Sequence, residues 1–321
     1  MLLDEHDRRL IDGWQRDFPI VSAPFAAIGA TLGLSESDVL GRLARLQQSG
    51  ALSRVGAVVR PNTVGASTLA AISVPAERLE SAAEAVVAEP GVNHAYEREH
   101  AYNIWFVVTA PDAEEVAAAI ARIEQRVGAP VLVLPMLRDF HIDLGFSLFG
   151  GAAVKRTAAA GGAAKVDAQD RRLLGAMEDG LDLVARPFQR VAGRLGWSES
   201  DVLARLAALV ASGVVSRFGL VLRHRHFGYG ANAMVVWDAP DDRLQEIAQG
   251  FAARDFVTLC YERPRREGWR YNLFTMIHGR EREAALAHVE ELVASAADIR
   301  DHAVLFSRRC FRQRGARLSA A

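Results

Sequence analysis

Side chains that could perform acid–base chemistry gather in one stretch of the first half of the chain. Tyr96, Arg98 and His100 alternate there with Glu97 and Glu99. Because successive side chains of a strand point to opposite faces, the first three share one face and the two glutamates share the other. An arginine beside a histidine and a tyrosine is suited to hold a carboxylate next to a proton donor. A solvated hairpin is the simpler interpretation of the same residues.

The matching stretch of the second half carries a short, arginine-rich insert. Arg263, Arg265 and Arg266 precede Trp269 and Tyr271 there. Guanidinium groups bind carboxylates in bidentate pairs and stay protonated, and aromatic rings stack on flat ligands. This combination predicts a flat aromatic ligand that carries several carboxylates. An ordinary solvated loop is again the alternative.

The last segment of each half adds further basic residues. Arg138–His141 reads Arg-Asp-Phe-His, and Arg309–Arg312 reads Arg-Cys-Phe-Arg. Each segment therefore places an arginine two residues before a phenylalanine. A single histidine such as His141 is more often a structural residue than a catalyst.

Several common kinds of active site have no support in the sequence. The chain contains no HExxH, no GxGxxG after a strand, no P-loop and no GxSxG. Cys260 and Cys310 are the two cysteines, which excludes a disulfide framework or a CxxC metal site. We therefore predict no metal site and neither metal-dependent hydrolysis nor nucleotide chemistry.

The elements that position these residues occur twice. Ser35–Leu40 recurs unchanged as Ser198–Leu203, and Asp7–Leu10 recurs at the same spacing as Asp170–Leu173. Tyr-Asn pairs follow later in both halves. A Gly- and Ala-rich stretch over residues 150–165 separates the halves and is typical of a flexible linker. The chain is therefore predicted to be a covalent pseudo-dimer of two related copies.

Each copy divides into two domains of an α+β fold. Residues 1–62 and 166–225 read as three short helices followed by a two-stranded wing, which predicts winged helix-turn-helix domains. Residues 63–149 and 226–321 read as strand, helix, strand, strand, helix, strand. That βαββαβ order predicts a ferredoxin-like sheet with helices on one face, so the open face must meet a partner or a ligand.

Composition limits the functional class. The chain has 321 residues, 50% of them hydrophobic and 24% charged, which is typical of a globular protein with two or more domains. The formal net charge of −1 removes the broad electrostatic argument for nucleic-acid binding. No run of residues has the length of a membrane helix, and the acidic start does not resemble a signal peptide. We therefore expect a cytoplasmic protein.

The first turn of the third helix argues against DNA reading. That turn would enter the major groove, and it reads Ser-Glu-Ser-Asp at Ser35–Asp38 and again at Ser198–Asp201. Two carboxylates in each copy would then face phosphates, so the winged modules are interpreted mainly as scaffold. Arg42 and Arg45, later in the helix, keep the DNA-binding alternative open.

At this point the residues resemble a known family. A winged helix followed by a ferredoxin-like domain resembles the Lrp/AsnC regulator architecture. The stretches Arg98–Phe106, Trp269–Gly279, Phe140–Asp143 and Arg309–Gln313 resemble the siroheme decarboxylases, in a fused two-subunit form. The resemblance implies conversion of siroheme to 12,18-didecarboxysiroheme with loss of two CO2, in d1 haem synthesis or siroheme-dependent haem synthesis.

The resemblance also implies roles for the residues above. His100 is the expected proton donor, Tyr102 and Arg98 would orient an acetate, and His141 is a second catalytic candidate. The residues expected to hold the substrate are Arg98, Arg138, Arg263, Arg265, Arg266, Trp269, Tyr271, Arg309 and Arg312. No cofactor is expected, because the iron enters as part of the siroheme. A histidine could instead be an axial iron ligand, and one site or two unlike sites remain open.

Two other functions compete with this hypothesis. One is a DNA-binding transcriptional regulator of the Lrp/AsnC type, with a small effector on the open sheet. The other is a haem-binding sensor or carrier without catalysis. For the decarboxylase we expect siroheme as the partner, with no DNA and no membrane. The intramolecular pseudo-dimer leaves further homo-oligomerisation open.

Overall fold

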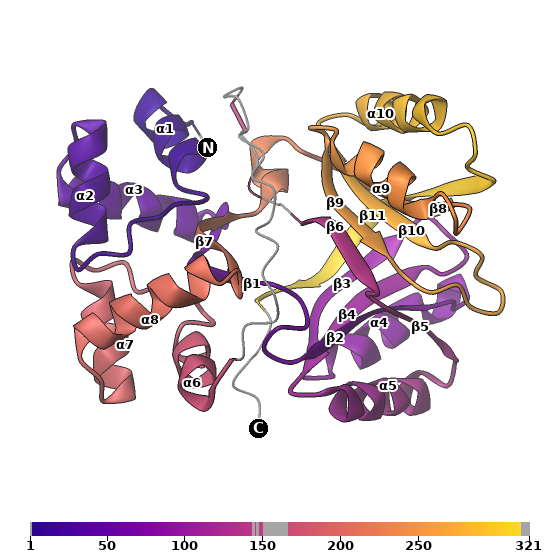
Figure 1. Ribbon diagram of the computed structural model, residues 1–321, viewed down its shortest axis with the longest axis horizontal. Helices are drawn as coiled ribbons and strands as arrows, with labels where there is room; N and C mark the ends of the chain where they lie inside the picture. Colours follow the sequence, from indigo (N-terminus) through magenta and orange to yellow (C-terminus); the bar gives the residue numbers. More distant parts are fainter. Residues whose placement is uncertain (1, 143–144, 146–147, 150–165, 316–321) are drawn as a thin grey trace. The chain divides into compact units, whose positions relative to one another are not determined.

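The computed structural model describes residues 2–142, 145, 148–149 and 166–315 (Figure 1). The predicted linker lies outside these residues. The described chain divides into two compact units, with boundaries after Val64 and Phe227 and before Gly145. Each unit takes one domain from each copy, so the molecule is organised by domain type. The winged-helix unit and the sheet unit are described separately below.

The winged-helix unit contains two sets of three helices. Side-chain caps begin the first and third helix of each set, with Asp4 and Ser35 in one copy and Asp167 and Ser198 in the other. The second helix of each set begins on a proline and ends at a glycine in the left-handed region. The helices are α1 (Glu5–Gly13), α2 (Pro24–Leu32), α3 (Glu36–Gln48), α6 (Ala168–Ala176), α7 (Pro187–Leu195) and α8 (Glu199–Ala211), followed by the short 3-10 helix η2 (His224–Phe227).

The predicted two-stranded wing within each copy is wrong. Each copy supplies one strand, β1 (Leu52–Val59) or β7 (Val215–Leu222), and the two pair with each other in an antiparallel sheet. Gly56 lies opposite Gly219 at the centre of this ladder. The apolar pattern of these residues fits a hairpin within one copy and a strand pair between copies equally well. In the structure the strand of the other copy completes the backbone hydrogen bonds that a hairpin would have supplied.

The sheet unit holds both ferredoxin-like domains in one nine-stranded sheet of order β5-β2-β4-β3-β11-β8-β10-β9-β6. Within each copy the strands follow the order expected for a βαββαβ fold. The elements of the first copy are β2 (Ala66–Ile72), η1 (Ala76–Arg78), α4 (Leu79–Val87), β3 (Val92–Arg98), β4 (Ile104–Ala110), α5 (Ala113–Val127), β5 (Val131–Pro135) and β6 (Arg138–Ile142). Those of the second copy are β8 (Ala231–Asp238), α9 (Leu244–Ala252), β9 (Val257–Glu262), β10 (Leu273–Gly279), α10 (Arg282–Ser295) and β11 (Asp301–Gln313). The predicted α+β fold, duplicated in tandem, is confirmed.

The last strand of each copy is shared between the two sheets. The first part of β11 pairs with β8 of its own copy, and its second part pairs with β3 of the other copy. In the first copy the equivalent segment forms two strands: β5 pairs with β2 of its own copy, and β6 pairs with β9 of the second copy. Each copy therefore completes the sheet edge of the other, and neither sheet keeps its inner edge exposed.

Three apolar clusters fill this unit. The helix-covered faces of the two sheets form one cluster each, around Phe106 in the first copy and around Trp237 in the second. The faces without helices contribute jointly to a third cluster that includes Trp105, Trp269 and Phe274. The open face thus meets the other copy. No helix of the described residues is long and apolar enough to cross a membrane.

Gly219 tests the pairing of the two winged-helix domains. A Cβ on Gly219 would lie 2.5 Å from the carbonyl oxygens of Trp14 and Gln15, whereas a Cβ on Gly56 would lie 3.3 Å from the Cα of Gly180. We expect Gly219→Ala to lower the free energy of unfolding by on the order of 3 kcal/mol, because backbone atoms must move. Chemical denaturation of both variants checks this. Equal losses for Gly219→Ala and Gly56→Ala would contradict the structure.

Candidate functional site

A histidine lies among aromatic rings from both copies in the sheet unit. His100 stands in the connection between β3 and β4, with its ring stacked at 6.2 Å from Tyr102. The ring of Trp269 meets both edge-on, at 5.6 Å from His100 and 5.7 Å from Tyr102. Trp105 and Tyr271 complete the group, at 5.4 Å and 5.1 Å from Trp269. We call these five residues the histidine–aromatic cluster.

The hydrogen bond of His100 defines its tautomer. The backbone N–H of Tyr102 donates to Nδ1 of His100 at 3.0 Å. In the neutral ring the proton therefore lies on Nε2, which is a donor and has no lone pair for a metal. Burial lowers the pKa of His100 below its ordinary value, because the charged imidazolium is less well solvated. This geometry favours a proton-handling histidine over an iron ligand, the two roles that the sequence left open.

Trp269 is the second unusual member of the cluster. It is 2% exposed, and its indole N–H has no acceptor among the described residues. The N–H of Trp105, in contrast, donates to the carbonyl of Tyr102 at 2.7 Å. An unpaired buried donor is costly, so it is a position where a bound acceptor would be favourable. Trp269 stands two residues before the second Tyr-Asn pair, as His100 stands before the first.

The two tyrosines of these pairs have different environments. The hydroxyl of Tyr271 donates to Asp301 at 3.0 Å. Burial raises the pKa of Tyr271, and this hydrogen bond to Asp301 raises it further. Tyr102 instead stacks on His100. The pseudo-symmetric positions therefore supply one histidine-linked phenol and one carboxylate-linked phenol.

Two buried arginines occupy equivalent positions in the copies. Arg98 donates to the carbonyl of Leu305 at 3.0 Å, and Arg263 donates to the carbonyl of Leu134 at 2.5 Å. Each acceptor belongs to the other copy, Leu305 to β11 and Leu134 to β5. Arg263 also lies over the ring of Tyr261 at 5.2 Å. Burial lowers the pKa of Arg263 to about 10, because its charge is neutralised by no carboxylate among the described residues.

The insert of the second copy uses its arginines within the loop. Arg265 binds the buried Asp238 at 2.6 Å and also reaches the carbonyls of Ala239 and Arg270. Arg270 binds the other oxygen of Asp238 at 3.0 Å. Arg266 is exposed and pairs through its backbone with Trp269 in a tight turn. The loop therefore holds Trp269 in place through a carboxylate that sequence reasoning did not single out.

The arginines of the last strands tie the copies together. Arg138 binds Glu262 at 2.8 Å, and the equivalent Arg309 lies 3.5 Å from Glu97 and 2.5 Å from Glu80. Arg312 donates to the carbonyl of Val92 at 3.3 Å. His141 lies on β6 opposite Cys260 of β9. These contacts give the four predicted residues clear structural roles, while their substrate roles stay predictions.

The asparagines of the Tyr-Asn pairs are structural residues that the sequence analysis did not single out. Asn103 accepts from the N–H of Val74 and donates to its carbonyl, at 3.2 and 2.8 Å. Asn272 makes the same pair of bonds with Ala239, both at 3.0 Å. Each amide thus closes the end of the first strand of its sheet. The repetition of the Tyr-Asn pair was the signal that could have identified them.

Removal of one of these amides tests that role. Asn272 is 4% exposed, so Asn272→Ala leaves the N–H of Ala239 unpaired in the interior, while the carbonyl of Ala239 keeps its hydrogen bond from Arg265. We expect the free energy of unfolding to fall by about 2–3 kcal/mol. Urea denaturation measures the change, with the exposed Gln249→Ala on α9 as the control. A loss no larger than that of the control would refute the assignment.

The winged-helix unit directs its helix arginines inward. Arg42 of α3 binds Asp4 at 2.7 Å and Asp7 at 2.7 Å, and the equivalent Arg205 of α8 binds Asp167 and Asp170 at 2.9 and 2.6 Å. A phosphate backbone would have to compete with these carboxylates.

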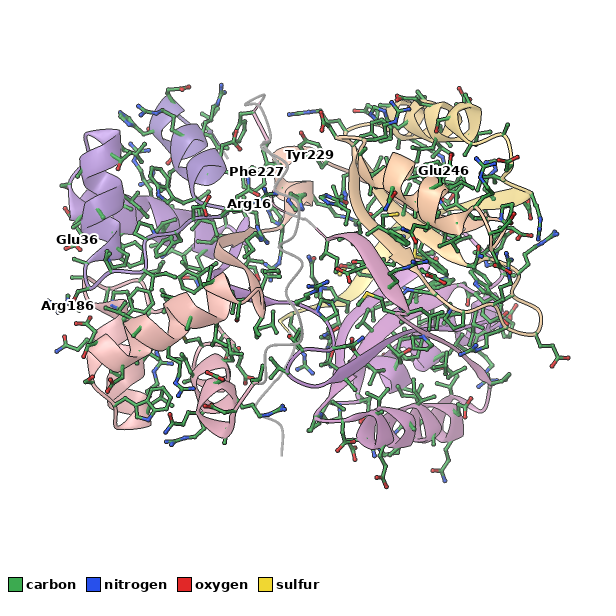
Figure 2. The ribbon with its side chains drawn as sticks, viewed as in Figure 1. Arg16, Glu36, Arg186, Phe227, Tyr229 and Glu246 are labelled. Carbon is green, nitrogen blue, oxygen red and sulfur yellow. The ribbon has the colours of Figure 1, made fainter. Side chains whose placement is uncertain are left out.

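The first residue of α8 is also engaged. Glu199 accepts from Ser22 of the other copy and from Arg186, both at 2.7 Å; Figure 2 labels Arg186 together with Glu36, the equivalent of Glu199 in the first copy. Over the described residues, no group of three or more His, Cys, Asp or Glu side chains is arranged to hold a metal ion.

The fold and the cluster define a class of protein, a tandem AsnC-like chain with paired winged helices. Comparison with family models agrees. The model of the AsnC-like ligand binding domain matches residues 64–141 and 226–312. The model of the siroheme decarboxylase NirDL-like HTH domain matches residues 7–52 and 170–215.

Known relatives identify the family more closely. The siroheme decarboxylase NirDL subunit of Paracoccus pantotrophus is 45% identical, over 98% of each chain. The siroheme decarboxylase NirD subunit of Stutzerimonas stutzeri is 49% identical over 46% of this chain and 97% of that protein. A crystal structure of the siroheme decarboxylase NirDL in complex with an iron-uroporphyrin III analogue is 30% identical, covers 98% of this chain and 94% of that one, and superposes with a TM-score of 0.70. The chain belongs to the NirDL-type siroheme decarboxylases, and the predicted resemblance is confirmed.

Proposed function

We propose that this chain is a lyase that removes two acetate carboxyl groups of siroheme as CO2, giving 12,18-didecarboxysiroheme. The observation that carries the proposal is His100, a half-buried histidine of defined tautomer inside an aromatic cluster. Support comes from the relatives named as siroheme decarboxylases and from the relative crystallised with an iron-uroporphyrin III analogue.

The reaction sets simple chemical requirements. Each acetate loses CO2 when its C–C bond breaks, and the electron pair of that bond remains on the substrate carbon. A proton must then form the new C–H bond, so one proton is needed for each CO2 released. The protein must hold the remaining carboxylates, bury the reacting one and deliver the proton. General-acid catalysis of this kind contributes roughly 10²- to 10⁴-fold.

His100 is suited to the proton delivery. In its resting state the ring is neutral and directs its Nε2–H away from the Tyr102 backbone N–H that occupies Nδ1. An approaching substrate carboxylate favours the charged ring and so raises its pKa again, although the proton added at Nδ1 displaces the hydrogen bond from the Tyr102 N–H. The bound substrate thus favours the protonated form of the residue that donates the proton. Tyr102 stacks on the ring and holds its orientation, and His141 remains the second catalytic candidate.

The remaining candidates divide by the partners they already have. Among the described residues, Arg263 donates to a backbone carbonyl and to no acid, so its charge is available to a carboxylate, and Arg98 makes the same carbonyl bond in the first copy. Trp269 and Tyr271 offer an unpaired N–H and flat rings to a macrocycle. Arg138, Arg265 and Arg309 would have to exchange an existing acid for a substrate carboxylate, so we assign them a positioning role.

The DNA-binding alternative has less support. Arg42 and Arg45 kept that alternative open. Arg42 is bound to two aspartates, as is its counterpart Arg205, while the exposed Arg45 lies 3.5 Å from Asp7. We propose that the winged-helix unit serves to pair the copies.

Anaerobic incubation with siroheme followed by mass spectrometry tests the function. We expect two successive losses of CO2 with the wild-type protein. With His100→Ala we expect CO2 release to fall by roughly 10²- to 10⁴-fold while siroheme binding, followed by its absorption spectrum, is retained.

His94→Ala provides the matched control, because His94 is a histidine on β3 of the same sheet outside the cluster. Its activity should equal that of the wild type. Full turnover by His100→Ala would show that another residue is the proton donor. Bound but unchanged siroheme with the wild-type protein would indicate a sensor, and operator binding without tetrapyrrole affinity would indicate a regulator.

The pH dependence follows from the direction of the His100 pKa. Burial lowers this pKa. In the free enzyme the imidazolium is therefore deprotonated at a pH below about 6.5, the ordinary pKa of histidine. If the imidazolium is the donor, kcat/KM falls about tenfold for each pH unit above that pKa. Because the bound carboxylate raises the pKa, the corresponding fall in kcat begins at higher pH. Rate profiles measured by CO2 release should show this separation, and a kcat/KM that is flat from pH 6 to 8 would contradict it.

A further inference from the structure

Tyr271 connects the histidine–aromatic cluster to an exposed carboxylate. Its ring meets that of Trp269 at 5.1 Å, and its hydroxyl donates to Asp301 at 3.0 Å. Asp301 is the first residue of β11, and 41% of its side chain is exposed. A chain of contacts therefore leads from water through a carboxylate and a phenol to the rings that lie beside His100.

The carboxylate of Asp301 is held in place but only weakly paired. Asp301 lies opposite Asp238 in the pairing of β11 with β8, where two like charges repel each other. Arg270 contacts both acids, at 3.0 Å from Asp238 and 3.6 Å from Asp301, and Asp238 also binds Arg265 at 2.6 Å. Among the described residues, Asp301 therefore has one guanidinium at a longer distance and the hydroxyl of Tyr271. Such a carboxylate is suited to exchange protons with water.

The first copy has no carboxylate at the equivalent position. The last strand of each sheet pairs with the first strand in the same register, and by this register the residue equivalent to Asp301 is Pro130. Tyr102, the counterpart of Tyr271, stacks on His100 instead. The two tyrosines occupy equivalent positions, yet one adjoins a histidine and the other a carboxylate that reaches water.

Two proton sources match the chemistry of the proposed reaction. Two CO2 molecules leave one macrocycle, so two protons are consumed, and His100 is neutral once it has donated one. The electron pair left on the substrate carbon is far more basic than a phenolate, so a tyrosine is able to protonate it. Burial raises the pKa of Tyr271, and the hydrogen bond to Asp301 raises it further. The hydroxyl of Tyr271 therefore keeps its proton at neutral pH until the carbon takes it.

We propose that Tyr271 is the second proton donor of the cluster and that Asp301 supplies its proton, an inference that rests on the proposed decarboxylation. When the second C–C bond breaks, CO2 leaves, and the electron pair of that bond takes the hydroxyl proton of Tyr271 to form the new C–H bond. The hydroxyl turns from Asp301 to the carbon for this step. Asp301, protonated by water at its exposed side, then returns a proton to the phenolate. His100 serves the first loss, because His100→Ala is expected to stop CO2 release.

Tyr271→Phe tests the donor, because it removes the hydroxyl and keeps the ring. The full chain is incubated anaerobically with siroheme, and the products are followed over time by mass spectrometry. We expect the first loss of CO2 at the wild-type rate and the second slowed by roughly 10²- to 10⁴-fold, so that the product lacking one carboxyl group accumulates. Tyr229→Phe is the matched control, since Tyr229 packs against Arg280 at 5.0 Å and is not a member of the cluster. This control should complete both losses at the wild-type rate.

Asp301→Asn tests the supply of the proton. The asparagine oxygen still accepts the hydrogen bond of Tyr271, but it carries no proton to the phenolate. With siroheme in excess we expect the singly decarboxylated product to accumulate. With enzyme in excess both losses should go to completion, because each phenol then donates only once.

Three results would overturn the proposal. One is Tyr271→Phe completing both losses at the wild-type rate, and another is Tyr271→Phe slowing both losses equally. The third is Asp301→Asn completing both losses at the wild-type rate with siroheme in excess. A wild-type protein that released no CO2 would instead refute the decarboxylation itself, so the two failures are distinguishable.

Discussion

The exchange of strands between the two copies is the interaction on which the structure depends. A four-stranded ferredoxin-like sheet with helices on one face leaves an apolar face exposed to water and a sheet edge open to pairing with another chain. Here the second part of β11 completes the edge at β3, and β6 completes the edge at β9. The same exchange brings Arg98 to the carbonyl of Leu305 and Arg263 to that of Leu134. The histidine–aromatic cluster exists only because both copies contribute rings to one interior.

Fusion of the copies allows equivalent positions to diverge. In two separate identical subunits every substitution appears twice, whereas one chain can place a histidine in one copy and a tryptophan at the corresponding position in the other. His100 and Trp269 are such a pair, and their rings meet at 5.6 Å. In this pair the indole N–H of Trp269 has no acceptor among the described residues.

Repetition and periodicity were enough to predict the domain types, their order and the duplication, because these depend on local patterns. The paired winged strands were not predictable, since Val55 and Val58 fit a local hairpin as well as a strand of the other copy. The stacked pair of His100 and Tyr102 was not predicted either: the alternation placed His100 on a strand face with Tyr96 and Arg98, but β3 ends at Arg98 and His100 lies in the connection that follows. The meeting of Trp269 with that pair depends on contacts between residues far apart in the chain, which no pattern of residue types records.

The arginines show most clearly that the type of a residue does not determine whether its charge is already paired with an acid. Sequence treats Arg263 and Arg265 alike, yet Arg265 is neutralised by the buried Asp238 while Arg263 bonds to a carbonyl. An arginine that already holds an acid must lose that bond before it binds a substrate carboxylate, so its net gain is small. One that holds a neutral carbonyl keeps its full charge for an incoming anion, at the cost of a strained resting state. A chain that binds a ligand with many carboxylates therefore needs arginines of both kinds, the paired ones to hold the scaffold and the unpaired ones to hold the ligand.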